Sequence, residues 1–353
     1  MFKKDGSSPS NIRDVAKLAG VSIATVSLVL NDKPGIKEGT KRKVLAAAKK
    51  LNYIPNIHAK RLFTKRTGCI GLIFASHIDD VLSNLVYSRV FRGASKSADR
   101  NRYNLISIYG EKEFIETHSL PRIVLERQAD GFLLIGRGIS RDFAYALKEQ
   151  NVPLASVVSL FENSNIPTVS PAFKEGTYIG VRHLASLGHR RIVFIDSPFE
   201  YWSSRMRIEG YQAALLESGI GFEEELVFES DLTAEGGYIA TKKLLDDRVD
   251  FTAISAVNDT TAIGAIKALK EAGLRVPEDI SVVGFDDIEL SIYSDPPLTT
   301  VWVPWEEVGS TAVDVLLDVI NGSHDGREMI ELPVKLVVRE SCRDVSKGRG
   351  SQR

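Results

Sequence analysis

Apolar residues recur three and four positions apart from residue 11 to residue 53, which predicts amphipathic helices in this segment. Asn11 can cap the first helix, and Asp14 stands three residues later, where its side chain can reach back to the cap. The pattern breaks at Gly20 and resumes at once. We therefore expect a first helix that begins at Asn11 and ends in a tight turn.

Two further helices follow this turn. Ser22 is a good cap for a second helix that ends at Leu30, and a turn-forming cluster separates it from a third helix at about 37–51. The residues expected to be buried in these two helices are Val26, Val29, Leu30, Val44, Leu45, Ala48 and Leu51. Three short helices, with a short glycine-containing turn between the first two, are typical of a helix-turn-helix domain.

The pattern changes after residue 67. Short apolar runs, such as 69–74, 190–196 and 279–285, now alternate with helical stretches. This alternation predicts parallel sheets with helices on both faces. Because about 280 residues exceed one comfortable hydrophobic core, we expect two doubly wound α/β subdomains.

The charged residues are divided unevenly between these two parts. The whole chain has a formal net charge of −1. Residues 1–66 contain fifteen Lys and Arg against four Asp and Glu, a net charge of +11, so the remainder carries −12. A basic head on an acidic body indicates a module that binds a polyanion such as nucleic acid. The alternative is a three-helix interaction module whose lysines are only solvated.

Several classes of protein are disfavoured by the sequence. Cys69 and Cys342 are too few and too far apart for a disulfide framework or a zinc site. The first residues lack the apolar stretch of a secretory signal, and no apolar run approaches the roughly 18–20 residues of a membrane span. We therefore expect a cytoplasmic protein with no membrane partner.

Catalytic motifs are also lacking in the sequence. Neither G-x-S-x-G nor H-E-x-x-H nor a P-loop occurs, and the segment 136–138 lacks the third glycine of a dinucleotide-binding loop. The acid pairs at 79–80 and 286–287 are adjacent along the chain, which does not by itself place carboxylates on either side of a substrate bond. We expect no enzymatic activity, no cofactor and no metal.

The second helix is the expected DNA-reading element. In a helix-turn-helix domain this helix places its N-terminal residues against base edges in the major groove. At helical spacing, Ile23, Ala24 and Leu28 would face the DNA. Thr25 and Ser27 offer hydroxyls to phosphates or bases.

Longer stretches of the chain resemble one known family. The likeness is carried by NIRDVAKLAGVSIATVSLVLN (11–31), KVLAAAKKLNYIPN (43–56), GHRRIVFI (188–195) and VPEDISVVGFDD (276–287), which are similar to segments of the LacI/GalR family of bacterial transcriptional regulators. It covers nearly the whole chain after Ser10. The resemblance implies a helix-turn-helix head, a hinge helix and a core similar to periplasmic sugar-binding proteins.

The same resemblance implies a function. It implies a repressor that binds a palindromic double-stranded operator as a homodimer or a higher oligomer. Its partner in the core would be a small-molecule effector, namely a sugar, a sugar derivative or another metabolite. The alternative is a solute-binding protein without a DNA role.

The pattern and the resemblance together divide the chain into domains. We expect disordered tails at 1–10 and 346–353, a helix-turn-helix DNA-binding domain at 11–53, a hinge at 54–67, and an effector-binding and dimerisation core at 68–345. Within the core, we expect a first subdomain of about 68–169 with 300–325 and a second of about 170–299 with 326–345.

The family pattern implies DNA contacts from the head and the hinge. The residues that match it are Ser22, Ile23, Ala24, Thr25, Ser27, Leu28, Asn31, Tyr53, Asn56, Ala59, Lys60 and Leu62. In the family, the leucine at the position of Leu62 wedges into the minor groove, and a small residue at Ala59 lets two hinges pack. The chain departs from the family at Leu28, where most members have an arginine that can contact guanine. The alternative for the hinge is a flexible basic linker.

The family's effector-contacting residues are matched in part. Arg207, Asn258 and Asp286 match its arginine, amide and carboxylate, and Trp202 could stack on a ring at the edge of the cleft. Each polar residue also has a structural alternative: Arg207 as a surface cation, Asn258 as a helix N-cap and Asp286 as a loop-capping acid. Other polar positions of the family are replaced, for example by Val158, so we expect a more apolar pocket than a usual sugar site.

Overall fold

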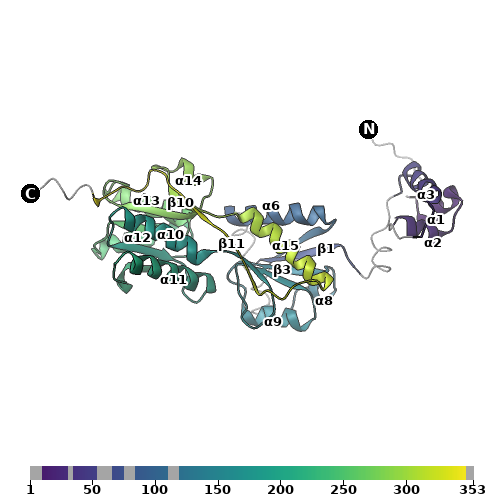
Figure 1. Ribbon diagram of the computed structural model, residues 1–353, viewed down its shortest axis with the longest axis horizontal. Coiled ribbons are helices and arrows are strands. Elements are labelled where there is room, and N and C mark those ends of the chain that lie inside the picture. The colour runs from purple at the N-terminus through teal and green to yellow at the C-terminus, as the bar shows by residue number, and fades with distance from the viewer. Residues whose placement is uncertain (1–9, 31–34, 54–65, 75–83, 110–118, 347–353) are drawn as a thin grey trace, which may run out of the picture. The chain divides into compact units, whose positions relative to one another are not determined.

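The computed structural model describes residues 10–30, 35–53, 66–74, 84–109 and 119–346. The chain divides into two compact units, Met1–Thr67 and Gly68–Arg353. The first is helical where it is described, and the second contains two parallel sheets covered by helices (Figure 1). The fold class expected from the sequence is confirmed.

The first unit begins with the expected capping box. It contains α1 (Ile12–Ala19), α2 (Ile23–Leu30) and α3 (Glu38–Lys50). Asn11 Oδ1 accepts the backbone N–H of Arg13 at 2.9 Å, and Asp14 Oδ2 accepts the backbone N–H of Asn11 at 2.9 Å. Gly20 then adopts a left-handed φ of 67°, which ends α1 at little steric cost. Ser22 caps α2, because its Oγ accepts the backbone N–H of Thr25 at 3.1 Å.

The three helices bury a small apolar core. Its buried members are Val15, Ala16, Val26, Val29, Val44, Ala47 and Ala48. The expectation that Leu45 is buried was wrong, since 46% of it is exposed. Successive helical residues point about 100° apart, so the face that buries Val44, Ala47 and Ala48 turns Leu45 outward.

The first subdomain of the second unit is built on one six-stranded sheet with strand order β11-β5-β4-β3-β1-β2. Its strands, all paired in parallel, are β1 (Cys69–Phe74), β2 (Asn104–Tyr109), β3 (Gly131–Ile135), β4 (Leu154–Val157), β5 (Thr168–Pro171) and β11 (Met329–Leu332). Its helices are α6 (Leu85–Arg100), α8 (Arg122–Leu125), α9 (Arg141–Glu149) and α15 (Trp305–Asn321). Helix α15 packs along α6 (Figure 1).

The second subdomain is built on another six-stranded sheet with strand order β12-β10-β9-β8-β6-β7. Its strands are β6 (Ile192–Asp196), β7 (Val227–Glu229), β8 (Ala253–Ala256), β9 (Ser281–Asp286), β10 (Thr299–Trp302) and β12 (Lys335–Val337). Of these, β12 pairs antiparallel with β10. Its helices are α10 (Phe173–Ser186), α11 (Trp202–Glu217), the short 3₁₀ helix η1 (Glu224–Leu226), α12 (Ala234–Asp246), α13 (Asp259–Glu271) and α14 (Leu290–Tyr293).

Two of the expected subdomain boundaries were wrong. We expected 300–325 in the first subdomain and 326–345 in the second. Instead β10 pairs with β9 in the second sheet, and β11 pairs with β5 in the first. An apolar run predicts a strand but not its partner, so the sequence pattern did not indicate these crossings.

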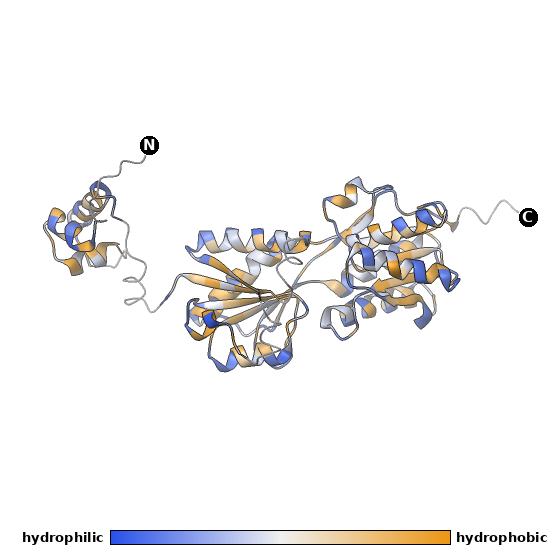
Figure 2. Cartoon of the chain, turned by 180° about the vertical axis from the view of Figure 1, so that it is seen from behind, coloured by the Kyte–Doolittle hydropathy of each residue, from blue (hydrophilic) through white to orange (hydrophobic). Residues whose placement is uncertain are grey.

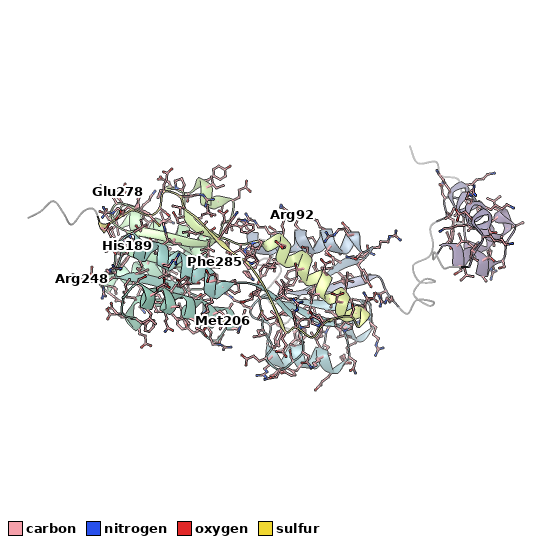
Figure 3. The ribbon with its side chains drawn as sticks, viewed as in Figure 1. Arg92, His189, Met206, Arg248, Glu278 and Phe285 are labelled. Carbon is pink, nitrogen blue, oxygen red and sulfur yellow. The ribbon has the colours of Figure 1, made fainter. Side chains whose placement is uncertain are left out.

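The two subdomains share one hydrophobic cluster. Figure 2 shows mostly hydrophobic strands and helices with a hydrophilic side. Phe173 and Phe285 of the second subdomain pack with Trp305 of the first, and the Phe173 ring centroid lies 6.0 Å from Phe285 and 6.5 Å from Trp305. Figure 3 shows Phe285 and Met206 at this junction. Within the described residues, no helix combines the length and apolar character that a membrane crossing requires.

Candidate nucleic-acid interface and ligand cleft

Helix α2 presents an apolar surface to solvent. Its inner side is buried through Val26 and Val29, whereas Ile23 is 45% and Leu28 is 43% exposed. Ala24 is also exposed, at the same end of the helix as Ile23. The residues expected to face DNA are therefore accessible on one side of α2.

The hydroxyl residues of α2 are already engaged within the head. The Ser22 and Thr25 hydroxyls are 2.9 Å apart and hydrogen-bonded to each other. Thr25 and Ser27 are half-buried. Tyr53 follows α3, packs against the core of the head and donates its backbone N–H to Ala48 O at 2.9 Å. The predicted contacts Asn31, Asn56, Ala59, Lys60 and Leu62, like residues 54–65 of the hinge, lie outside the described residues.

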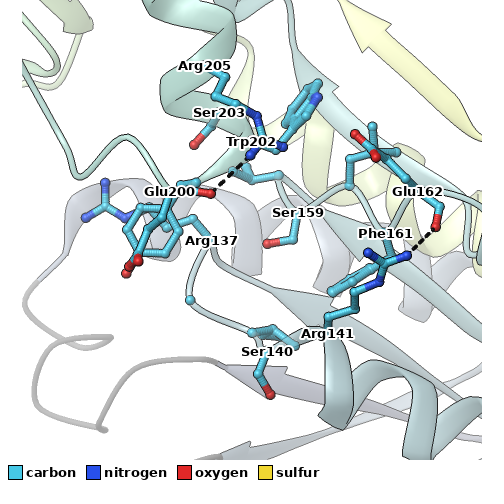
Figure 4. Close-up of a pocket in the computed structure, with 15 residues that line it drawn as sticks. Arg137, Ser140, Arg141, Ser159, Phe161, Glu162, Glu200, Trp202, Ser203 and Arg205 are labelled. Carbon is cyan, nitrogen blue, oxygen red and sulfur yellow. Dashed lines mark hydrogen bonds between the residues drawn. The ribbon is translucent and has the colours of Figure 1, made fainter.

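A cavity of about 400 Å³ opens between the two subdomains (Figure 4). The first subdomain lines it with residues 137–141 and 158–162, which follow β3 and β4. The second lines it with residues 200–203 and Arg205, which lie near the N-terminus of α11. Ligands of α/β proteins bind at the carboxyl ends of parallel strands, and this volume is typical of small-molecule sites.

Trp202 and Val158 lie on the wall of this cavity. The Trp202 ring packs edge-on against Phe173, with centroids 6.4 Å apart. Val158 has a φ of 77°, a left-handed conformation that is uncommon for a β-branched residue. Such outliers cluster at binding sites. Trp202 therefore lies at the cleft, where we expected it, because it is one of the residues that line the cavity.

Arg207 is buried next to the cleft and, like Asp286, is not among the residues that line the cavity. Only 7% of it is exposed, so the alternative of a surface cation does not apply. Its Cζ lies 4.1 Å from the centroid of the Phe173 ring, and its Nη1 lies 3.6 Å from Asp196 Oδ1. Burial lowers the pKa of Arg207, while the charges of Asp196 and Asp286 act in the opposite direction.

Asp286 joins the two subdomains. It ends β9 with a φ of 106°, and its Oδ1 accepts the Trp305 Nε1–H at 3.1 Å. Its backbone oxygen accepts a hydrogen bond from Arg89 Nη1 at 3.3 Å. Burial, followed by the charge of Asp259, raises the pKa of Asp286 well above its usual range, and Arg207 opposes this shift.

Asn258 has the structural role of a helix N-cap, which was the alternative to ligand binding. Its Oδ1 accepts the backbone N–H of Thr261 at 2.7 Å, and its Nδ2 donates to Leu232 O at 2.9 Å. The side chain therefore caps α13, and Asn258 is not part of the cavity wall.

Other polar groups of the cleft were missed at the sequence level. Arg137 and Ser159 of the first subdomain and Ser203 of the second line the cavity, and Asp196 is buried beside Arg207. In the sequence, Arg137 belongs to the segment 136–138, which lacks the third glycine of a dinucleotide-binding loop. Its position two residues after a buried strand was the signal that could have identified it.

A helix-turn-helix unit joined to a two-subdomain core with a cavity at its strand ends defines a class of DNA-binding regulators that carry a ligand-binding core. Comparison with known proteins identifies the family. Residues 11–56 match the model for bacterial regulatory proteins of the lacI family. Residues 181–342 match the periplasmic binding protein-like domain.

Relatives match along almost the whole chain. The probable HTH-type transcriptional repressor ExuR of Bacillus subtilis (strain 168) is 35% identical over 333 residues, which cover 94% of this chain and 98% of the relative. Catabolite control protein A of Priestia megaterium is 32% identical over 333 residues, which cover 94% and 99%. The structure of the lac repressor dimer bound to operator and the anti-inducer ONPF has a TM-score of 0.80 and 31% identity, covering 95% and 100%. The chain belongs to the LacI family of bacterial regulatory proteins.

Proposed function

We propose that this protein is a sequence-specific transcriptional repressor that binds a palindromic operator as a homodimer and is switched by a small molecule in its core. The proposal is carried by one combination: a basic head with an exposed apolar face on α2, and a cavity between two subdomains. The similar lac repressor structure is described as a dimer bound to operator and to an anti-inducer, which supports both parts. The proposed place of action is the cytoplasm.

In the proposed complex the N-terminal part of α2 lies in the major groove. Ile23, Ala24 and Leu28 contact base edges there, and apolar side chains suit the methyl group of thymine. Thr25 and Ser27 contribute hydroxyls to phosphates or bases. The remaining proposed DNA contacts are Ser22, Asn31, Tyr53, Asn56, Ala59, Lys60 and Leu62.

The proposed switch acts through the contacts between the subdomains. Asp286 and Trp305 hold the second subdomain to the first, and Arg207 is buried close enough for the charge of Asp286 to act on it. A ligand that prefers one degree of cleft closure shifts the population of that state and hence the affinity for the operator. Trp202, Arg207 and Asp286 are the proposed effector contacts. Asn258 supports the site by capping α13.

The DNA-binding part of the proposal is tested with full-length protein and two matched charge substitutions. Ile23→Glu places a carboxylate on the proposed reading face, and Leu45→Glu places one on α3 at a site of nearly equal exposure. We expect Ile23→Glu to abolish binding to a labelled operator duplex in fluorescence anisotropy and Leu45→Glu to retain most of it. A wild-type protein that binds no DNA would instead support the alternative of a solute-binding protein.

The salt dependence of the same binding provides a second measurement. Lys and Arg that neutralise phosphates release counterions, so log affinity should fall linearly with log salt with a slope of several units. A slope near zero would contradict the proposal that the basic head contacts the DNA backbone.

A further inference from the structure

The cavity wall contains an arginine, Arg137, on which the charge of the buried Arg207 acts. Arg137 follows β3, and its guanidinium lies 5.3 Å from the centroid of the Tyr201 ring. Its Nη1 is buried and has no hydrogen-bond partner among the residues that the structure describes. Burial and, next in importance, the positive charge of Arg207 lower the pKa of Arg137 to about 10. The charge of Arg207 therefore acts unfavourably on the Arg137 guanidinium.

Arg207 also has donors that are left unused. Its Nε and Nη1 are buried without a hydrogen-bond partner in the described part of the chain. The distance of 3.6 Å from Nη1 to Asp196 Oδ1 permits charge attraction but is too long for a hydrogen bond. Asp196 is held elsewhere, because its oxygens accept hydrogen bonds from Ser197 N and Ser204 Oγ, both at 2.7 Å.

A third unused polar group lies on the same helix. Ser203 lines the cavity, is 1% exposed, and its Oγ has no hydrogen-bond partner among the described residues. It precedes Arg207 by four residues, so the two side chains share one face of α11. Tyr201, the N-cap of this 16-residue helix, provides no side-chain cap. The positive end of the helix dipole is thus at the cavity as well.

The acidic groups nearby do not satisfy these donors. Asp196 is engaged by its serines, and Asp286 Oδ1 accepts from Trp305. Glu162 and Glu200, which also line the cavity, are exposed to solvent. Buried donors without acceptors are unfavourable, and an anion supplies both acceptor oxygens and the opposite charge. A neutral sugar hydroxyl supplies an acceptor without the charge.

We infer that the effector of this protein carries an anionic group, a carboxylate or a phosphate, which binds to Arg137, Arg207 and Ser203. The inference rests on the proposed function, because it concerns the ligand of the same cleft. Arginine binds both groups through paired N–H donors. The proposed effector is therefore an acid or a phosphorylated metabolite rather than a neutral sugar.

The test uses the full-length protein and the two simplest probes, sodium acetate and sodium phosphate. Each anion is titrated at constant ionic strength against sodium chloride while the thermal unfolding midpoint is recorded. Binding to the native state raises this midpoint in a saturable way. We expect at least one of the anions to do so for the wild type, and the more effective one identifies a carboxylate or a phosphate site.

The same titrations on variants assign the effect to the cleft. Arg137→Gln and Arg207→Gln should weaken the binding of that anion by roughly 10- to 100-fold, as expected for the loss of charge-assisted hydrogen bonds. The matched control is Arg182→Gln, which removes an exposed guanidinium of α10 that lies outside the cavity, 3.8 Å from Glu217 Oε1. It should change the affinity by less than about twofold. If a glutamine variant does not fold, Arg137→Lys keeps the charge, loses the paired donors and should also bind more weakly.

Two outcomes would overturn the inference. One is a wild-type midpoint that responds to acetate and phosphate only as it does to chloride. The other is an equal loss of affinity in the Arg137, Arg207 and Arg182 variants, which would indicate general charge screening. Operator binding of the same wild-type preparation is measured in parallel. If operator binding persists while the anion effect is absent, the anion site fails and the proposed function stands. If operator binding is itself absent, the proposed function fails.

Discussion

Replacing Trp305 with phenylalanine removes one hydrogen bond that joins the two subdomains. Trp305 begins α15 in the first subdomain, and its Nε1 donates to Asp286 Oδ1 in the second at 3.1 Å. Both residues are buried, so the carboxylate oxygen would lose its donor in a place that is largely closed to water. Leaving one partner of a buried hydrogen bond unsatisfied costs about 1–3 kcal/mol. We expect the free energy of unfolding to fall by about this amount, with a further loss from the smaller ring.

A double-mutant cycle separates the hydrogen bond from the change in ring size. Trp305→Phe, Asp286→Ala and the double variant are unfolded with urea and compared with the wild type. Alanine at position 286 is strained because φ is 106°, but this strain is common to both Asp286 variants and cancels in the cycle. We expect a coupling energy of about 1–3 kcal/mol. A coupling below about 0.5 kcal/mol, within the usual error of additivity, would refute the role given to this contact.

Trp302→Phe is the matched control for the single variant. Trp302 ends β10, is half-buried, and its ring lies 4.6 Å from Lys335 Nζ of the same subdomain. Its indole makes no hydrogen bond to Asp286 in the described structure, although the two residues are paired in the β9–β10 register, so its replacement should couple less strongly with Asp286→Ala than Trp305→Phe does. Equal coupling for both tryptophans would mean that the cycle reports a general loosening of the core.

Three further substitutions test other parts of the structure. Leu28→Arg should change the preferred base at one symmetric position in each half-site, because arginine can donate to guanine, and DNA selection that gives both proteins one motif would contradict this. Gly309→Ala should lower the free energy of unfolding by about 1–3 kcal/mol in urea, because a Cβ there would lie 2.0 Å from Val90 O between α15 and α6. Gly39→Ala, where a Cβ meets nothing within 4 Å, is its control and should not destabilise. His189 is buried between Thr252 and Ser281, and burial lowers its pKa from 6.5 to about 4. Between these values the unfolded chain binds a proton that the native state does not, so stability falls by up to about 3 kcal/mol as pH drops from 6.5 to 4. His189→Asn should remove that part of the pH dependence in urea unfolding, and an unchanged pH profile would contradict the assignment.

The helices of the head could be predicted because their signals are local. Asn11 and Asp14 form the capping box that their spacing indicates, and Gly20 takes the left-handed conformation expected of the turn. The error at Leu45 arose within a correctly predicted helix, because the predicted buried face included this one exposed residue. Local patterns thus predicted the helices of the head, and the packing of the three helices determined which face of each helix is buried.

The exchange of strands between the subdomains could not be predicted in the same way. Both β10 and β11 are short apolar strands, and their sequences do not show which sheet they join. β10 pairs with the preceding strand β9, and β11 pairs with β5, which lies much earlier in the chain, and neither pairing is encoded in the apolar pattern of the strand itself. The alternation of strands and helices was sufficient for the fold class but not for these boundaries.

The cleft was predicted only where a family motif exists. Trp202 lines the cavity, and Arg207 and Asp286, which the family motifs indicated, are buried near each other but are not among the lining residues. Their contact with an effector stays a prediction. The role of Asn258 as a cap became clear only from the hydrogen bonds at both ends of its amide. Arg137 was missed because it acquires its role from the fold, which brings the end of β3 close to α11.

The most direct test of sequence-specific binding is selection of duplex DNA from a random pool by the full-length protein, followed by affinity measurements on the enriched sequence. We expect an inverted repeat whose half-sites are contacted by α2 of each protomer, with an affinity at least about 10³-fold above that for random DNA at physiological salt. Enrichment of no motif, with equal affinity for selected and random duplexes, would contradict the assignment of this protein as a sequence-specific repressor.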